Sequence, residues 1–256
     1  MKLTQRNYFS KKANLEYMSV SQWKAFERCQ HSALAEIKGK YKREESTALL
    51  VGSYVDSYFE GTLANFIKAH PEIYTKGGTL RADFTQAEAI IQRIMKDRLF
   101  MEYLSGEKQV IMTGEICGVP IKIKIDSLLP DKIVDLKVMK DFESSYHAEK
   151  GVLPWFEAWG YDLQGAVYQE IVRQNTGKTL PFYLAAATKE KVTDIDIVHM
   201  NPKSLEYALE KFKGSVELFD AIKKGIIPPE RCEKCEYCKN TKVLTEPTDS
   251  EEFYLL

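Results

Sequence analysis

Hydrophobic positions recur with a helical period along the first hundred residues. Ser19 or Ser21 is a suitable N-cap for a helix from about Gln22 to Lys38 that ends at Gly39, with apolar positions at Trp23, Phe26 and Leu34. A second helix is predicted over Ser46 to Ala69. A third begins at Thr85, where Thr85 and Glu88 have capping-box spacing, and its apolar positions are Ile90, Ile91, Ile94, Met95 and Leu99.

From Gln109 the hydrophobic period changes to alternation, which predicts short strands bounded by Gly118, Pro120 and Pro130 in a three-stranded antiparallel meander. Pro154 is placed as the first residue of a long helix to about Gln174, and Asn175-Thr176-Gly177 stops it. Two strands, Phe182 to Ala187 and Asp194 to Met200, and a helix from Pro202 to about Lys224 follow. The order α, βββ, α, ββ, α predicts one α/β domain behind a helical N-terminal portion.

Composition excludes several classes of protein. With 256 residues, 44% hydrophobic and 11% aromatic, the chain has enough apolar material for a large core, so disorder is excluded as the main state. The 36 Lys+Arg and 37 Asp+Glu give a net charge of −1, so any binding of nucleic acid must be local. We find neither a membrane-spanning apolar run nor a signal peptide, and we expect a cytoplasmic protein with no membrane partner.

Two strands of the meander bring acidic residues together. In IKIKID, Asp126 shares the polar face with Lys122 and Lys124, and in IVDLKV, Asp135 shares a face with Lys137. If Pro130 and Asp131 are the two turn residues, Asp126 lies directly opposite Asp135. Pro-Asp is not a favoured tight-turn sequence, so a longer loop or bulge would shift this pairing.

Opposed carboxylates repel unless a cation or a shared proton offsets the charge. Acidic residues are common in so charged a chain, but two acids and a lysine on otherwise apolar strands form a costly arrangement with no evident structural use. The two carboxylates and the Leu136 carbonyl are suitable ligands for Mg²⁺ or Mn²⁺, and Lys137 is placed to orient a water or stabilise developing charge. This chemistry fits phosphodiester hydrolysis.

The segment IKIKIDSLLPDKIVDLKV resembles the signature of the PD-(D/E)xK nuclease superfamily, and Gln164-Gly165-Ala166-Val167-Tyr168 resembles the Q-x-x-x-Y motif of its RecB-like and exodeoxyribonuclease VIII (RecE-like) branches. The resemblance implies a restriction-endonuclease-like core with a mixed central sheet, in which Gln164 and Tyr168 face the active site beside Asp126, Asp135 and Lys137. Gly52 to Asp56 resembles the G-x-x-x-H helix of these branches, with aspartate where histidine is usual. Asp56 is therefore a candidate third carboxylate ligand, with Glu60 and Glu115 as alternatives.

The sequence Cys232-Glu233-Lys234-Cys235-Glu236-Tyr237-Cys238 spaces three thiols as metal ligands. Cys29 is the natural fourth ligand, because its segment resembles the N-terminal cysteine segment of iron-sulfur nucleases. The resemblance favours a [4Fe-4S] cluster, whereas spacing leaves Zn²⁺ open, with Cys29 or His31 completing the site. Cys117 is interpreted as a small side chain at a turn.

The first 43 residues are distinctly basic, with only Glu16, Glu27 and Glu36 opposing ten Lys and Arg: Lys2, Arg6, Lys11, Lys12, Lys24, Arg28, Lys38, Lys40, Lys42 and Arg43. With Lys122, Lys124 and Lys140 this segment is a candidate DNA path, although a charge run is usually only a solvated face. We expect one nuclease domain over 1–256, composed of a helical portion (1–105), a catalytic core (106–225), a cysteine cluster (226–240) and an acidic, then apolar tail (241–256) that docks on the chain or a partner.

Three functions follow as hypotheses. The first is a metal-dependent DNA exonuclease with an iron-sulfur cluster that acts on linear duplex or single-stranded DNA; the resemblance implies phage-type recombination or repair and a single-strand annealing protein as partner. The second is a DNA-binding scaffold of the same fold without catalysis, which the unusual Asp56 keeps open. The third is a zinc-stapled interaction module whose acids are only surface residues.

Overall fold

The centre of the molecule is a five-stranded mixed sheet in the order β1-β2-β3-β6-β7. The computed structural model describes residues 1–148, 151–247 and 249–250. The strands are β1 (Glu107–Ile116), β2 (Val119–Leu128), β3 (Ile133–Met139), β6 (Phe182–Thr188) and β7 (Ile195–His199). The antiparallel pairs β1-β2 and β2-β3 confirm the predicted meander, while β6 runs parallel to β3 and antiparallel to β7. The predicted α/β class with a mixed central sheet is confirmed.

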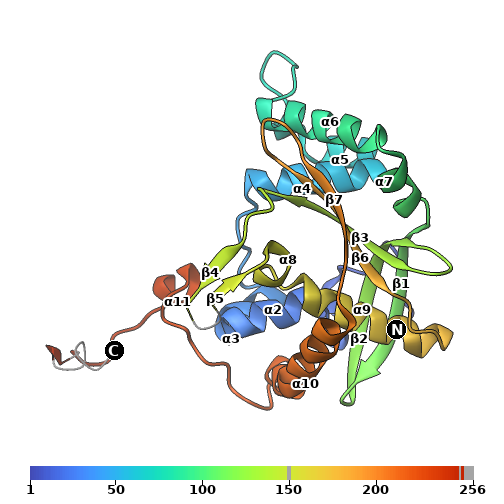
Figure 1. Cartoon of the computed structure of the whole chain (residues 1–256). Helices are drawn as coiled ribbons and strands as arrows, with labels where there is room; N and C mark the ends of the chain where they lie inside the picture. Colours follow the sequence, from blue (N-terminus) through green and yellow to red (C-terminus); the bar gives the residue numbers. More distant parts are fainter. Residues whose placement is uncertain (149–150, 248, 251–256) are drawn as a thin grey trace.

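Helices cover both faces of this sheet, as Figure 1 shows. The upper group is α4 (Thr47–Phe59), α5 (Leu63–Ala69), α6 (Ala82–Met95) and α7 (Arg98–Tyr103), and the lower group is α2 (Val20–Arg28), α3 (Gln30–Ile37), α9 (Tyr161–Thr176) and α10 (Pro202–Lys224). Each group has its own hydrophobic core. Because side chains alternate along a strand, β3 contributes side chains to both cores: Ile133 lies in the lower core and Val134 in the upper one.

Smaller elements complete the described chain. They are α1 (Lys11–Glu16), a 3₁₀ turn η1 (Pro71–Ile73), α8 (Trp155–Ala158), α11 (Glu236–Asn240), and the hairpin of β4 (Ser145–His147) and β5 (Gly151–Leu153). Sequence periodicity did not predict the hairpin, because three-residue strands are too short to show alternation. No described helix combines the length and apolar composition that a bilayer crossing requires. Residues 248 and 251–256 of the expected tail lie outside the described residues, so its docking stays a prediction.

Three predicted helices are each divided in two. The helix predicted over Gln22 to Lys38 breaks at Cys29, whose φ of −168° is extended. The helix predicted over Ser46 to Ala69 breaks near Gly61 (φ 76°), and the one predicted from Pro154 breaks at Gly160 (φ 64°). Glycine adopts these positive φ values without the steric cost of a Cβ. Pro154 is the N-cap of α8 and precedes the helix.

Helix caps were predicted with mixed success. Of the two predicted N-caps, Ser19 and Ser21, the first is the cap of α2, and it forms a full capping box with Gln22. The capping box at Thr85 is wrong: α6 begins three residues earlier, at Ala82, and the Thr85 hydroxyl donates to the Arg81 carbonyl (3.3 Å) inside the first turn. Leu99 lies in α7, a separate helix that Asp97 caps by accepting from the Phe100 amide (2.9 Å).

Helix α9 approaches the sheet closely through Gly165. A Cβ at this position would lie 2.6 Å from Cδ1 of Phe182 on β6 and 3.0 Å from Cδ2 of Leu205 on α10. This close approach brings the side chains on either side of Gly165 near the strands. Gly177, in the left-handed conformation (φ 72°), ends the helix where the sequence predicted a stop.

Candidate active site

The hairpin of β2 and β3 has the predicted register. The Leu129 amide donates to the Lys132 carbonyl (3.0 Å), so Pro130 and Asp131 are the turn residues. The ladder pairs Leu128 with Ile133 and Ser127 with Val134, and it ends there. In this register Asp126 comes next, opposite Asp135, and its Oδ2 accepts from the Leu136 amide (3.0 Å) in place of a strand partner. The two strands therefore separate where the acids lie.

Asp135 is 1% exposed and both of its carboxylate oxygens have partners. Gln164 on α9 donates to Oδ1 (2.6 Å), and the Lys137 ammonium forms an ion pair with Oδ2. Burial raises the pKa of Asp135 to about 7; Lys137 opposes this shift and Asp126 adds to it. Burial alone would lower the pKa of Lys137, but Asp135 and Asp126 raise it above its ordinary value. Lys137 thus remains an ammonium ion.

Asp56 on α4 supplies a third carboxylate. Its Oδ1 is buried and has no hydrogen-bond partner among the described residues. Burial, and then the charge of Asp126, raise the pKa of Asp56 well above its ordinary value. Glu60, one turn later, has a pKa that is also raised by burial, against the opposing effect of Lys124. A divalent cation with oxygen ligands would offset this repulsion and use the unpartnered oxygen, so the donor set fits Mg²⁺ or Mn²⁺.

Two adjoining cavities give these groups a common space. A small cavity of about 10 Å³ is lined by Asp56, Glu60, Asp126 and Leu136, among others, and it is about large enough for one water or ion. Beside it lies a cavity of about 310 Å³. Its lining includes most of the predicted site residues: Asp56, Glu60, Lys122, Lys124, Asp126, Asp135, Lys137, Gln164 and Tyr168. Tyr168 donates its hydroxyl to the Lys124 carbonyl (3.0 Å) and so fixes α9 against β2.

Three predicted residues do not take the expected places. Glu115 lies six residues along β1 from the position opposite Asp126, roughly 20 Å away, and its backbone bonds Gln174. Lys122 is 2% exposed, because its ammonium donates to the Tyr8 carbonyl (2.5 Å) and to Asn14 Oδ1 (2.7 Å). Lys140 is exposed, pairs with Asp141 (2.9 Å) and lies outside the lining of the larger cavity. Burial of Lys122 argues against its predicted contact with DNA.

Gln109 and Lys24 also line the cavity; Gln109 was not predicted, and Lys24 was named only within the basic N-terminal segment. Gln109 donates to Asp126 Oδ1 (3.1 Å) from a backbone with φ 55°, an unusual conformation for a non-glycine residue. Lys24 on α2 donates to the Trp159 carbonyl (3.0 Å), and burial, with the nearby charge of Lys137, lowers its pKa to about 8. In the sequence Lys24 is only one of many basic residues. Its place beside Asp135 depends on the packing of α2, which no local pattern predicts.

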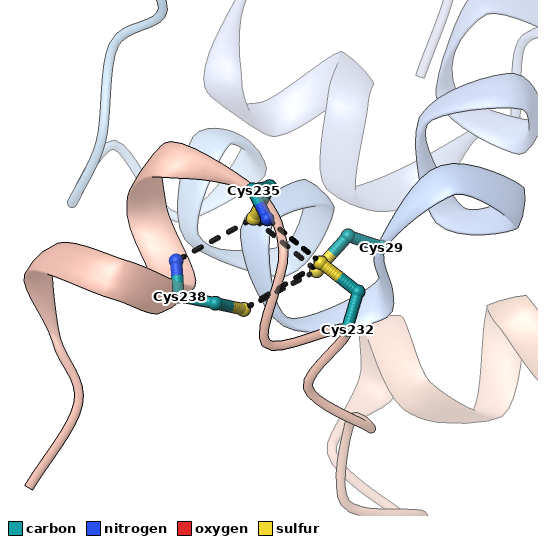
Figure 2. A group of neighbouring side chains, drawn as sticks. All are labelled: Cys29, Cys232, Cys235 and Cys238. Carbon is teal, nitrogen blue, oxygen red and sulfur yellow. Dashed lines mark hydrogen bonds between the residues drawn. The ribbon is translucent and has the colours of Figure 1, made fainter. Parts of the chain in front are cut away.

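The four predicted cysteines lie together, as Figure 2 shows. Their Sγ atoms are all within 4.8 Å of one another, with Cys29 and Cys238 at 3.5 Å and Cys29 and Cys235 at 3.7 Å. Backbone amides of Cys235 and Lys234 lower the pKa of the Cys232 thiol to about 6, which favours the ligating thiolate. His31 lies at the edge of the group, with Nδ1 4.0 Å from Cys238 Sγ. Cys29 therefore completes the set.

The spacing of the sulfurs bears on which metal fits. Four thiolates around one tetrahedral ion at about 2.3 Å lie about 3.8 Å apart. Three Sγ separations, 3.5, 3.7 and 4.0 Å, are close to this value, and all lie within 4.8 Å. A four-iron cluster places four irons and four sulfides between its thiolates and needs a wider opening. Cys117, by contrast, is exposed in the β1-β2 turn (φ 50°), as predicted, and lies apart from this group.

The sheet order, the acids at the split of β2 and β3, and the lysine and glutamine beside them define a PDDEXK-like nuclease fold. The family model "PDDEXK-like domain of unknown function" (DUF3799) matches residues 19–241, and the chain belongs to this family. The crystal structure of a "Putative exonuclease" from Eubacterium rectale superposes with a TM-score of 0.96 at 48% sequence identity, covering 99% of this chain and 98% of that one. No curated protein matches. Family and neighbour together support a nuclease.

Proposed function

We propose that the protein is a divalent-metal-dependent DNA exonuclease. The observation that carries this proposal is the convergence of Asp56, Asp126 and Asp135 on one cavity, with an unpartnered carboxylate oxygen on Asp56 and the Lys137 ammonium beside Asp135. The likeness to the Eubacterium rectale protein, which is named an exonuclease, supports the assignment. Against the inactive-scaffold alternative, Asp56 lines the same cavity as Asp126 and Asp135.

Each residue has a role that follows from its contacts. Asp56, Asp126, Asp135 and the Leu136 carbonyl would hold the ion, which when bound polarises the scissile phosphate and lowers the pKa of a water. Lys137, which stays charged, orients the attacking water and stabilises charge that develops on the phosphate.

Two further residues act through their neighbours. Gln164 holds one oxygen of Asp135 and so fixes the direction of its remaining lone pairs. Tyr168, through the Lys124 carbonyl, keeps β2 at its distance from α9. Both residues are therefore assigned positioning roles.

Digestion of end-labelled linear DNA with Mg²⁺ or Mn²⁺ tests this function. Wild type should release nucleotides, and Asp135→Ala and Lys137→Ala should lose at least about a hundredfold in rate while still binding DNA. Asp131→Ala is the matched control, because Asp131 is an exposed acid in the turn of the same hairpin, paired with its neighbour Lys132. Covalently closed circular DNA distinguishes exonuclease from endonuclease activity. An exonuclease needs a DNA end and leaves the circle intact. Equal rates in all four proteins would refute the proposed site.

For the four cysteines we propose one tetrahedral ion of the zinc type. The support is the sulfur spacing, which is narrower than the [4Fe-4S] cluster expected from the resemblance requires. The ion would staple the α2-α3 junction to the segment after α10 and would have no part in hydrolysis. Metal analysis of anaerobically purified protein tests this assignment: one zinc per chain and no colour support it, whereas about four irons and a brown colour would overturn it.

The recombination setting and a single-strand annealing partner are proposals that rest on the resemblance alone. Co-purification of the protein with an annealing protein on resected DNA is the corresponding test.

A further inference from the structure

Phe9 lies at the cavity and yet remains open to solvent. It is 72% exposed, and it is the one exposed phenylalanine among the described residues. Single exposed apolar residues are common and need no explanation by themselves. Phe9, however, lines the same cavity as Asp126, Asp135 and Lys137, and the Lys124 ammonium lies 5.4 Å from its ring centroid. The Lys124 ammonium therefore lies over one side of an exposed aromatic ring that lines an acidic site.

The backbone around Phe9 is held in place by hydrogen bonds. The carbonyl of Tyr8 accepts from the buried Lys122, and the carbonyl of Phe9 accepts from Asn14 Nδ2 (3.3 Å). Ser10 caps α1 directly after Phe9. Tyr8 itself is buried, and its ring meets that of Phe9 edge to face at 4.9 Å. Lys122 and Asn14 therefore fix the backbone that carries the exposed Phe9 ring.

The size of the cavity limits what the ring can meet. Its volume is about 310 Å³, which leaves room for a group the size of a nucleotide beside the ring. An exposed aromatic ring next to a cation is the combination with which proteins bind single strands, because every base has a face that stacks.

We propose that Phe9 is a stacking platform for one unpaired base, with Lys124 contacting the adjoining phosphate, so that the enzyme takes DNA as a single strand or a frayed end. This inference rests on the proposed function and adds to it the class of substrate and a specificity-determining residue. A preorganised platform raises affinity because less conformational entropy is lost when the base binds.

Equilibrium binding without metal tests the platform independently of catalysis. By fluorescence anisotropy, wild type should bind a single-stranded oligonucleotide about tenfold tighter than a blunt duplex of equal length, and Phe9→Ala should lose about tenfold on the single strand. Phe9→Trp should restore binding, whereas Phe9→Leu, which keeps the apolar volume without the ring face, should not. Tyr207→Ala removes a 75% exposed aromatic from α10, outside the cavity lining, and should bind as wild type does.

Abasic oligonucleotides identify the stacked base. Moving one abasic site through the first nucleotides from each end should reveal one position that weakens wild-type binding about tenfold and leaves Phe9→Ala unchanged. Equal loss in both proteins at every position, or unaltered binding by Phe9→Ala, would overturn the inference. If Phe9-dependent binding is found but wild type cleaves no DNA, the proposed function fails and the platform stands. If wild type cleaves DNA but Phe9→Ala binds it as tightly as wild type, the proposed function stands and the platform is refuted.

Discussion

The side-chain amide of Gln164 donates to Asp135 Oδ1 at 2.6 Å, while Lys137 pairs with the other oxygen of the same carboxylate. One residue comes from helix α9 and the other from strand β3, and the hydrogen bond joins these two layers at the site. Each carboxylate oxygen has a second lone pair, so Asp135 can accept from both neighbours and still face an ion. The geometry of Asp135 is therefore set before any substrate binds.

Removing the Gln164 amide should lower turnover more than it lowers DNA binding. Replacement of a residue that orients a metal ligand typically costs about 10- to 100-fold, and we expect Gln164→Ala to lose that much in kcat under saturating DNA. Initial rates and Mg²⁺ titrations measure both effects. Gln174→Ala is the control on the same helix, because Gln174 bonds the exposed backbone of Glu115. A fall in rate of similar size in both variants would indicate general loosening of α9.

Activity should rise with pH through about 7. The ion needs Asp135 as a carboxylate, and its pKa of about 7 means that a proton competes below that pH. The rate at limiting Mg²⁺ should therefore fall about tenfold per unit below pH 7. A pH profile at limiting and at saturating Mg²⁺ tests this, since saturation should move the midpoint to lower pH. A midpoint pH that does not change with Mg²⁺ concentration would contradict the role of Asp135 as a ligand.

The same pKa has a consequence for the metal-free fold. The folded chain holds a proton on Asp135 up to about pH 7, whereas an unfolded aspartate loses it near its usual 3.8. This carboxyl therefore contributes stability that is complete below about pH 4 and is lost as the pH rises through 7. Urea unfolding of metal-free protein should show this decline, and Mg²⁺ should reverse it at pH 8.

Three acids compete as the third ligand, and single variants separate them. Asp56→Ala should weaken Mg²⁺ or Mn²⁺ binding about tenfold or more, because its Oδ1 is buried without a hydrogen-bond partner and the residue lines the cavity of Asp126 and Asp135. Glu60→Ala should have a smaller effect, and Glu115→Ala none, since Glu115 lies at the far end of β1. Isothermal titration with Mn²⁺ gives the three affinities. An effect of Glu115→Ala equal to that of Asp56→Ala would rule out the proposed ligand set.

Loss of one cysteine ligand should destabilise the protein without touching the active site. Cys235→Ser would remove one of the proposed ligands between the segment after α10 and Cys29, and we expect Tm to fall by about 5–15 °C. Surviving folded protein should retain its kcat. Cys117→Ser, at an exposed turn, should leave Tm unchanged. Scanning calorimetry on both variants, with metal content measured alongside, makes the comparison.

Local chemistry of the sequence accounts for much of the site. Alternation along the two strands and a two-residue turn were enough to place Asp126 opposite Asp135, because register fixes neighbours within one hairpin. Three of the four cysteines could be named for the same kind of reason, since they share one short segment, whereas Cys29 was named from the family resemblance. Helix breaks at Cys29, Gly61 and Gly160 were missed, because apolar periodicity continues across a bend while the backbone does not.

By itself the sequence determined the class of fold, the paired acids with their lysine, and three of the four clustered cysteines, all of which depend on residue type and short spacing. Only the tertiary structure decided that Asp56 lies with the other acids while Glu115 does not. It also decided that Lys122 donates to the backbone of Tyr8, and that Phe9 and Lys24 line the cavity. These outcomes depend on how α1, α2 and α4 pack against the sheet. The energy of packing comes from many weak contacts between residues distant in the chain, so it cannot be predicted from a local sequence pattern.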